Sequence, residues 1–182
     1  MTPPPPSRDQ PPGPAIHLPT PVLEPFCDLV VTIGAPVEVG PTPQGLRRMI
    51  PITGGSVTLA PMLSTGGAVP GGPVLRGRVL PGGADYQLVV GGTTAQLDAR
   101  YVIELDDGAR LFVHNTALRV ATAEVTARLL RGETVDPAAV YFRCQPRFET
   151  AAPAWLWLGE RQFVGTGLRL PDAVQLRFFV LA

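Results

Sequence analysis

The sequence predicts a mainly β fold, a single antiparallel β-barrel with one short helix, and three observations support this prediction. From residue 26 onward, short runs rich in Val, Ile, Leu, Phe and Tyr recur at intervals of about 8 to 12 residues. Gly, Pro and Asp separate these runs, as in an all-β sandwich or barrel. One segment carries a helical pattern, so helices contribute little to the expected core.

Ten segments fit the strand pattern, and four dipeptides between them favour tight turns. Each dipeptide supplies a positive φ or a preset φ, so the strands on either side are expected to pair antiparallel. The dipeptides are Gly82-Gly83, Gly91-Gly92, Asp107-Gly108 and Pro171-Asp172. The predicted strands are residues 26–33, 46–53, 56–59, 74–80, 85–90, 94–105, 110–115, 140–148, 161–169 and 173–180.

One helix and one long loop account for most of the remaining domain. Residues 122–131 place Val125 and Leu129 on one stripe, and Gly132 is suited to end the helix. Residues 60–73 are rich in Gly and Pro without periodicity, which predicts a loop long enough to act as a mobile flap.

The N-terminus is set apart by its proline content. Ten of the first 25 residues are Pro, so this stretch lacks the backbone donors that a helix or sheet needs. We expect an extended tail over residues 1–25 and a barrel domain over residues 26–182. A passive extension or a strap over the barrel mouth is favoured over a proline-rich ligand for a partner domain.

Composition supports one packed domain and excludes several functions. The 182 residues are 45% hydrophobic and 16% charged, with a formal net charge of zero and no block of like charge. Nucleic acid is not expected as a partner, because binding it needs a basic surface. All fifteen basic residues are Arg, which excludes lysine Schiff-base chemistry and P-loop phosphate binding.

Other recognisable sites and signals are also missing from the sequence pattern. Neither a signal peptide nor an apolar stretch long enough to span a bilayer is seen, so no membrane partner and a cytoplasmic location are expected. Cys27 and Cys144 fit no metal-ligand spacing and are expected to be buried, reduced thiols. Ser56 lacks a nucleophile elbow, and no dinucleotide-binding glycine motif follows a strand. We therefore expect no cofactor and no metal.

Alternation along the predicted strand 94–105 separates a polar face from an apolar one. Asp98, Arg100 and Glu104 share one face, whereas Tyr101 lies on the other. A solvent-facing surface is the commoner arrangement for such a polar face. The alternative is that this face lines a barrel interior wide enough to hold a ligand.

Two further strands show the same kind of polar face. Arg143 belongs to a polar set in residues 140–148, and Asp85 shares a face with Gln87 in residues 85–90. If these faces turn inward together, carboxylates and guanidiniums meet in a low-dielectric cavity, where their pKa values and pairing become chemically useful.

Several short motifs, in a particular order and spacing, resemble those of a known family. They cover nearly everything after Phe26 and read GLRR at 45–48, PITGG at 51–55, GGADYQ at 82–87, LDARY at 97–101, DDG at 106–108, DP at 136–137, YFR at 141–143, FE at 148–149 and FVGTG at 163–167. In these motifs the chain resembles the bacterial and fungal family called domain of unknown function 3237. The resemblance implies a calycin-like antiparallel barrel with a ligand-sized interior and little settled function. An apparent insertion that follows Pro61 and runs through Gly72 departs from the family pattern and implies a specialised member.

Acid–base chemistry by a few ionisable side chains is what these exclusions leave. Asp85 or Glu104, if buried, has a raised pKa suited to moving a proton, and His114 is a further candidate base. Each has a plainer alternative. Asp85 can satisfy turn amides, Glu104 can pair with Arg100 on the surface, and His114 can be an ordinary strand-end residue.

Candidate ligand-binding residues come from the same strands and from the aromatic segments. Arg100 or Arg143 can hold an enolate, carboxylate or β-dicarbonyl oxygen through two hydrogen bonds, and Tyr101 is a further polar candidate. Trp157 and Phe163 can form an apolar ligand wall, with core packing as the alternative.

Two functions fit these candidates best. The first is a cofactor-independent cyclase or isomerase that encloses a hydrophobic, oxygenated small molecule of secondary metabolism and polarises it with a carboxylate or Arg. The second is a lipocalin-like carrier or sensor that binds such a compound unchanged. A structural interaction module would instead have a filled barrel without a cavity. The oligomeric state, a homo-oligomer included, stays open at this point.

Overall fold

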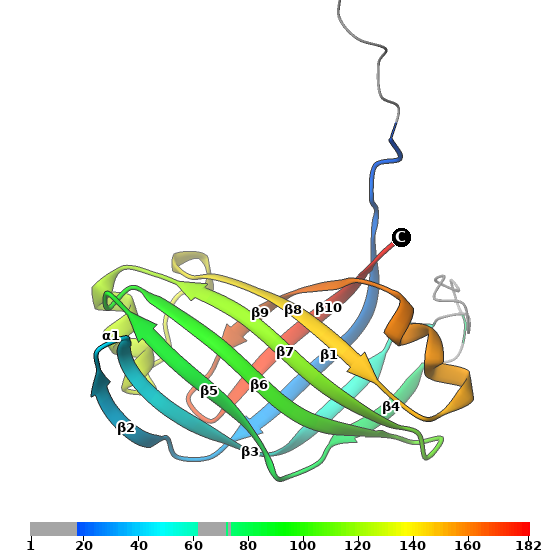
Figure 1. The fold of residues 1–182 in the computed structure, drawn as a ribbon, viewed down its shortest axis with the longest axis horizontal. Helices are drawn as coiled ribbons and strands as arrows, with labels where there is room; N and C mark the ends of the chain where they lie inside the picture. Colours follow the sequence, from blue (N-terminus) through cyan, green and yellow to red (C-terminus); the bar gives the residue numbers. More distant parts are fainter. Residues whose placement is uncertain (1–17, 62–71, 73) are drawn as a thin grey trace, which may run out of the picture.

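The structure of the protein, a computed structural model, describes residues 18–61, 72 and 74–182. Most of the predicted tail, residues 1–25, and most of the predicted flap, residues 60–73, lie outside the described residues. Ten strands, one α-helix and two short 3-10 helices make up the described chain (Figure 1). In chain order they are β1 (Leu23–Ile33), β2 (Val37–Thr42), β3 (Gly45–Leu59), β4 (Leu75–Val79), β5 (Gly83–Val90), β6 (Thr94–Leu105), β7 (Arg110–Val120), α1 (Ala123–Leu130), η1 (Pro137–Ala139), β8 (Tyr141–Glu149), η2 (Pro153–Glu160), β9 (Phe163–Arg169) and β10 (Ala173–Leu181).

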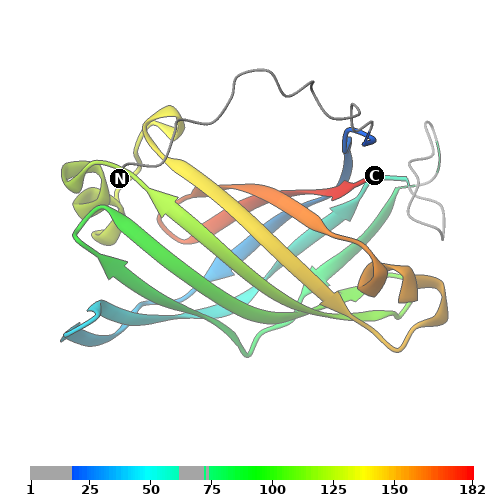
Figure 2. The same cartoon turned by 45° about the horizontal axis from the view of Figure 1, so that its top comes forward.

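The strands form one antiparallel sheet that closes on itself into a barrel (Figure 1 and Figure 2). β1 pairs with β10 on one side and with β3 on the other, which joins the two ends of the sheet. The wall continues from β10 through β9, β8 and β7 to β6. β4 and β5 both bridge β3 and β6, and β2 forms a hairpin with the start of β3. The prediction of a single antiparallel β-barrel is confirmed.

β3 runs unbroken through a glycine pair that the sequence pattern predicts as a break between two strands. Gly54 and Gly55 have φ values of 151° and 141°, which side chains rarely adopt. A Cβ atom at Gly55 would collide with the carbonyl oxygen of Val30 on β1. The two glycines therefore let β3 pass close to β1 rather than turn back, and one strand replaces the predicted two.

Other strand boundaries also differ from the prediction. β1 begins at Leu23, inside the predicted tail, and its pairing with β10 is irregular next to Pro25, which has no backbone donor. β7 continues past its predicted end at Asn115 as far as Val120, because its last residues pair in register with both β6 and β8. The sequence pattern predicts neither β2 nor η2.

The single predicted α-helix is present as α1 and marks one end of the barrel. Its first turn is capped by Thr122, whose hydroxyl accepts a hydrogen bond from the Val125 N–H at 3.3 Å. Gly132 follows the helix with a φ of 79°. α1 follows the end of β7 on the left of Figure 1, whereas η2 lies at the opposite end of the barrel.

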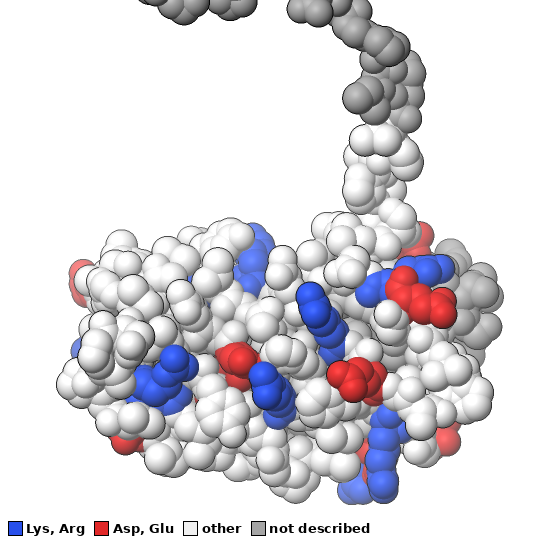
Figure 3. Space-filling model, in the orientation of Figure 1, with Lys and Arg blue, Asp and Glu red and all other residues white. Residues whose placement is uncertain are grey.

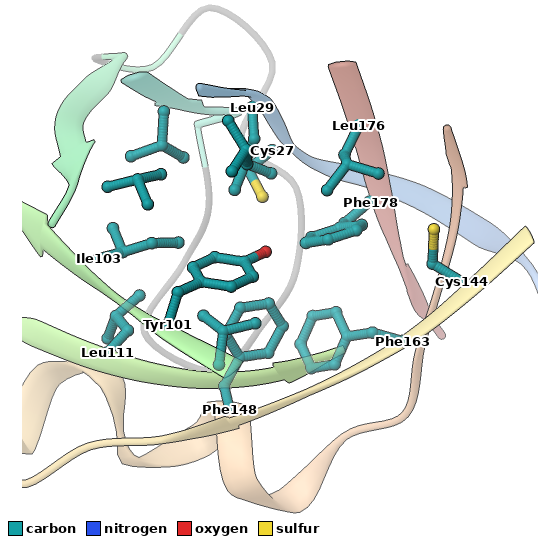
Figure 4. Packing of buried hydrophobic residues seen from close by; sticks show 14 of the residues in the cluster. Cys27, Leu29, Tyr101, Ile103, Leu111, Cys144, Phe148, Phe163, Leu176 and Phe178 are labelled. Atoms are coloured by element: carbon teal, nitrogen blue, oxygen red, sulfur yellow. The ribbon is translucent and has the colours of Figure 1, made fainter. Parts of the chain in front are cut away.

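Aromatic side chains fill the interior towards the η2 end. The rings of Phe26, Phe148 and Phe163 lie 4.9 to 5.4 Å apart between centroids. Trp157 of η2 meets Phe26 edge-on at 5.9 Å, and Figure 4 shows Phe148, Phe163 and Phe178 around this part of the core. Phe163 is 3% exposed and Trp157 is 6% exposed. Both are core residues, which corrects the prediction that they wall a ligand.

Two buried cysteines belong to the same interior. Cys27 and Cys144 are both free thiols, as the sequence predicts. Burial raises the pKa of Cys27 well above its ordinary value and that of Cys144 to about 12. Because the thiolate is the reactive form, both side chains are inert at neutral pH and act as small apolar core residues.

A glycine on β9 tests how tightly this core is packed. A Cβ atom at Gly165 would lie 2.5 Å from Cδ1 of Phe178, a fully buried ring. We expect Gly165→Ala to lower the free energy of unfolding by about 1 to 3 kcal/mol, because the ring has no room to move. Gly159→Ala is the matched control, since its nearest neighbour is an oxygen at 4.0 Å. Urea unfolding of both variants measures the difference, and equal stabilities would contradict the packing.

Candidate functional site

The polar face of β6 points out of the barrel. Glu104 accepts hydrogen bonds from Arg78 at 2.6 Å and from Arg110 at 2.9 Å, both exposed Arg residues of neighbouring strands. These two guanidiniums lower the pKa of the Glu104 carboxyl. Arg100 lies beside Asp98 at 3.4 Å with more than half of its side chain exposed. The prediction that Arg100 and Glu104 line the interior is therefore wrong, and the solvent-facing alternative holds.

Two other predicted site residues also lie on the outer surface. His114 of β7 contacts Asp98 through Nε2 at 2.9 Å, on the same outer face as Arg100. Arg143 of β8 is exposed and lies over the Tyr141 ring at 4.9 Å. On the face drawn in Figure 3, positive and negative side chains lie among one another. His114 and Arg143 lie on the outside of the barrel wall, which corrects their assignment to an interior site.

Two predicted site residues do meet inside the barrel. Asp85 of β5 and Tyr101 of β6 line one cavity of about 50 Å³. Apolar side chains of β1, β3 and β10 form much of its remaining wall. Figure 4 shows the Tyr101 ring reaching from β6 into the interior, with its hydroxyl oxygen directed away from the wall. This small cavity in the barrel interior is the candidate functional site.

Asp85 is held in place by two hydrogen bonds from its own side of the barrel. Its carboxylate accepts one from Nε2 of Gln87 at 2.7 Å and one from the backbone N–H of Asp98 at 3.1 Å. Burial nevertheless raises the pKa of Asp85, because desolvation outweighs these hydrogen bonds and the nearby charge of Arg119. A carboxyl group with a raised pKa in a cavity is suited to exchanging a proton with a bound compound.

Arg119 and Asn115 of β7 complete this side of the cavity, and neither is among the site residues predicted from the sequence. Arg119 is only 4% exposed and makes no hydrogen bond or ion pair with any described residue. Burial lowers its pKa to about 10, while Asp85 counteracts the shift. The Arg119 guanidinium is therefore charged at neutral pH and keeps its donors unpaired beside the cavity.

Two more arginines approach from the α1 end. Arg48 of β3 is 5% exposed, and its Nη1 lies 3.5 Å from both the Leu130 carbonyl oxygen of α1 and a Glu38 carboxylate oxygen. Arg169, at the end of β9, lines the cavity and donates to the Ala173 carbonyl oxygen at 3.2 Å. Burial and the charge of Arg48 lower the pKa of Arg169. Three guanidiniums thus share the α1 half of the interior.

Buried polar atoms near the cavity lack protein partners. The Tyr101 hydroxyl and Oδ1 of Asn115 have no hydrogen-bond partner among the described residues, and neither does Nε of Arg48. Leaving such an atom unpaired costs about 1 to 3 kcal/mol. Tyr101 and Asn115 are both among the residues that line the cavity, so two of these unpaired atoms belong to its wall residues.

A signal for part of the missed set is present in the sequence. Arg119 lies an even number of residues after Val113 and Asn115, so a strand extended to Val120 places all three on one face. Arg48 alternates in the same way with apolar Ile50. The informative pattern is one polar residue on an otherwise apolar face. Arg169 lies at a strand end and carries no such signal.

The described residues contain neither a cluster of metal-ligand side chains nor a membrane-spanning helix. Within residues 18–61, 72 and 74–182, no group of three or more His, Cys, Asp or Glu side chains is placed to hold a metal ion. The same part of the chain contains no helix of the length and hydropathy needed to cross a bilayer.

The fold and the cavity define a closed antiparallel β-barrel whose apolar interior holds a small polar site. The model of the family described as "Protein of unknown function (DUF3237)" matches residues 21–181. The chain belongs to this family, which confirms the resemblance seen in its motifs.

Three similar proteins place the chain within that family and fold. A UPF0311 protein of Rhodopseudomonas palustris is 40% identical over 157 residues, covering 85% of this chain and 94% of that protein. A β-barrel-like protein of Acinetobacter baumannii has a crystal structure with a TM-score of 0.73 at 35% identity, covering 92% of this chain and all of that one. A crystal structure of an enzyme from Penicillium herquei shares the fold with a TM-score of 0.62 at 19% identity, with coverage of 92% of this chain and 100% of that one.

The opposite pKa shifts of Asp85 and Glu104 predict opposite pH dependences of stability. Asp85 has a pKa raised above 3.8, so its contribution is largest at low pH and is lost as pH rises through the raised pKa. Glu104 has a pKa lowered below 4.5, so its contribution is present above that value and is lost as pH falls through the lowered pKa.

Urea unfolding across a pH series measures both effects. Relative to Asp85→Asn, the parent protein should lose stability as the pH rises from about 4 through the raised pKa of Asp85. Relative to Glu104→Gln, it should lose stability only below about pH 4.5. The same sign for both residues would show that Asp85 is not buried as described.

Proposed function

We propose that the protein is a cofactor-independent cyclase or isomerase that encloses part of an oxygenated small molecule in its barrel, with Asp85 as the residue that moves a proton. One observation carries this proposal. A carboxyl group with a raised pKa lines the interior cavity together with an arginine, Arg119, that has no hydrogen-bonding partner among the described residues. Acid–base groups and charge-stabilising groups in one dry cavity are the arrangement that proton-transfer catalysis needs.

The proton balance of such a reaction needs only the residues of the cavity. The Asp85 carboxylate takes a proton from an acidic C–H or O–H group of the substrate. The electron pair left behind moves onto an oxygen that Arg119 stabilises, or attacks a carbon of the same molecule to close a ring. Asp85 then returns the proton to a second position. Substrate and product therefore have the same composition and differ in connectivity.

The size of the cavity limits what it encloses. About 50 Å³ holds a few non-hydrogen atoms, far less than the 300 to 1,000 Å³ of a pocket that surrounds a drug-sized ligand. The reacting end of a substrate fits among Asp85, Tyr101 and Arg119. Half-buried Arg169 and Ile33 also line the cavity, and an apolar body would extend past them.

An analogy between folds also favours an enzymatic function. The Penicillium herquei protein that shares this barrel is an enzyme. At 19% identity the likeness concerns the fold, so the reaction of this chain is argued from its own cavity residues.

Binding without conversion is the second candidate, and one observation favours it. The Asp85 carboxylate already accepts two hydrogen bonds within the protein. Such bonds stabilise the charged form and are typical of a carboxylate that orients its neighbours. A carrier of this kind would use Asp85 to hold Gln87 and the β6 backbone in position instead of moving a proton.

Mass spectrometry separates the two candidates because isomerisation and cyclisation leave the mass unchanged. The protein is incubated with a small-molecule extract of the organism that carries it, and the extract is analysed by liquid chromatography and mass spectrometry. We expect one compound to decrease while another of identical mass and different retention time increases. Asp85→Asn should slow this conversion by at least about a hundredfold, in line with the loss of a general base.

Glu104→Gln is the matched control, because Glu104 lies on the outer surface with its two Arg partners. It should convert the compound at the parent rate. Retention of a compound by the protein without any pair of equal mass would support the carrier instead. Conversion that survives in Asp85→Asn would remove Asp85 from the mechanism.

A further inference from the structure

Positive charge exceeds negative charge in the α1 half of the barrel interior. Arg48, Arg119 and Arg169 come from three different strands, and the charges of Arg48 and Arg169 both lower the pKa of Arg119. Asp85 is the one carboxylate among the described residues that line the cavity. Arg119 and Arg169 line the cavity as well, so with all groups ionised its lining residues carry two positive charges and one negative charge.

The surroundings of each arginine show which of them lacks compensation. Arg48 has the Glu38 carboxylate at 3.5 Å towards the surface. Arg169 has a bonded carbonyl oxygen and the nearby charge of Asp172. Arg119 is the exception, because its only compensating neighbour is the carboxylate of Asp85, with which it makes no ion pair or hydrogen bond. Burying a guanidinium in this way is unfavourable unless its donors are used.

The hydrogen-bonding groups around Arg119 add a second, independent observation. The Tyr101 hydroxyl is a donor without a partner among the described residues, in a side chain that is 3% exposed and lines the same cavity. An anion accepts hydrogen bonds from both Arg and Tyr, whereas a cation accepts none. Arg119 and Tyr101 thus both border the cavity and both carry hydrogen-bond donors.

We propose that the interior site binds its ligand through a compact, singly charged group of two oxygens, a carboxylate or the enolate of a β-dicarbonyl, held by the Arg119 guanidinium and the Tyr101 hydroxyl. The planar fork of a guanidinium matches two oxygens that share one charge. The cavity volume of about 50 Å³ suits such a group better than a polyphosphate. This inference rests on the proposed placement of the ligand in the interior and names its chemical class.

Small probe compounds test the charge requirement directly. Propionate and the neutral, nearly isosteric propionamide are titrated into the full-length protein at low ionic strength, and binding is followed by calorimetry and by chemical shifts. Pentane-2,4-dione is titrated in a separate arm as the enolate source. Propionate should bind at least about tenfold more tightly than propionamide, because a charge-assisted pair of hydrogen bonds is lost in the amide. Equal binding of the acid and the amide would overturn the proposal.

Variants assign the binding to Arg119. Arg119→Met should weaken propionate binding at least about tenfold, whereas Arg100→Met should leave it unchanged because Arg100 lies on the outer face. In the absence of probe, Arg119→Met should unfold at the same or a higher urea concentration, since an unpaired buried charge is removed. A purely structural arginine would give the opposite result, with a lower urea midpoint and unchanged binding.

Other outcomes are equally decisive. If Arg119→Met does not fold, Arg119→Lys keeps the charge without the fork and should bind propionate more weakly than the parent protein. Chloride that competes as strongly as propionate at equal concentration would refute the two-oxygen fork. Failure of the anion to bind, together with intact conversion of a compound of equal mass, would refute this inference and leave the proposed function standing. Anion binding without any conversion would support this inference and refute the proposed catalytic function.

Discussion

The pairing of β1 along both of its edges is the constraint on which the rest of the structure depends. Its contacts with β10 and β3 join the two ends of the sheet, so one face of every strand in the wall is enclosed. An enclosed side chain must pack against others or find a hydrogen-bonding partner, because water cannot supply one freely. A polar residue on an inner face therefore has to be explained by its neighbours or by a ligand. On the outer face, where Glu104 and Arg100 lie, the same residue type needs no such explanation.

The interior divides into two halves with opposite effects on stability. At the η2 end, Phe26, Phe148 and Phe163 pack edge to face, an arrangement that stabilises a core beyond its buried area. At the α1 end, buried Arg119 and half-buried Asp85 lie without direct contact, which opposes folding. The well-packed half supplies the stability that allows the other half to remain unsatisfied. Residues that break local rules in this way are concentrated at functional sites.

Turn chemistry and alternation predict most of the fold, while the site is predicted only in part. Tyr101 is on an apolar face and Asp85 follows a glycine turn, so both positions can be inferred from their strands. Strand faces with several charges, such as that of Glu104, point to solvent. Exposing many charged side chains costs little free energy, whereas burying them costs much more. Arg119 escapes detection because β7 is longer than its sequence pattern indicates. Closure of the barrel brings together side chains from strands that are distant in sequence. The alternation pattern within a single strand does not predict which of these side chains meet.

The excess of positive charge in the barrel interior also favours the proposed proton transfer. Before transfer, the negative charge in the cavity resides on Asp85; after transfer to a neutral ketone or phenol, Asp85 is neutral and the charge resides on the substrate oxygen. The total charge inside the barrel is the same in both states, so the reaction buries no additional charge. The three arginines only redistribute their interaction from one oxyanion to the other. A carboxylate that binds while Asp85 is protonated places one negative charge on the ligand. The enolate formed when Asp85 takes a proton places the same charge there, so a site that binds the carboxylate tightly also stabilises the enolate.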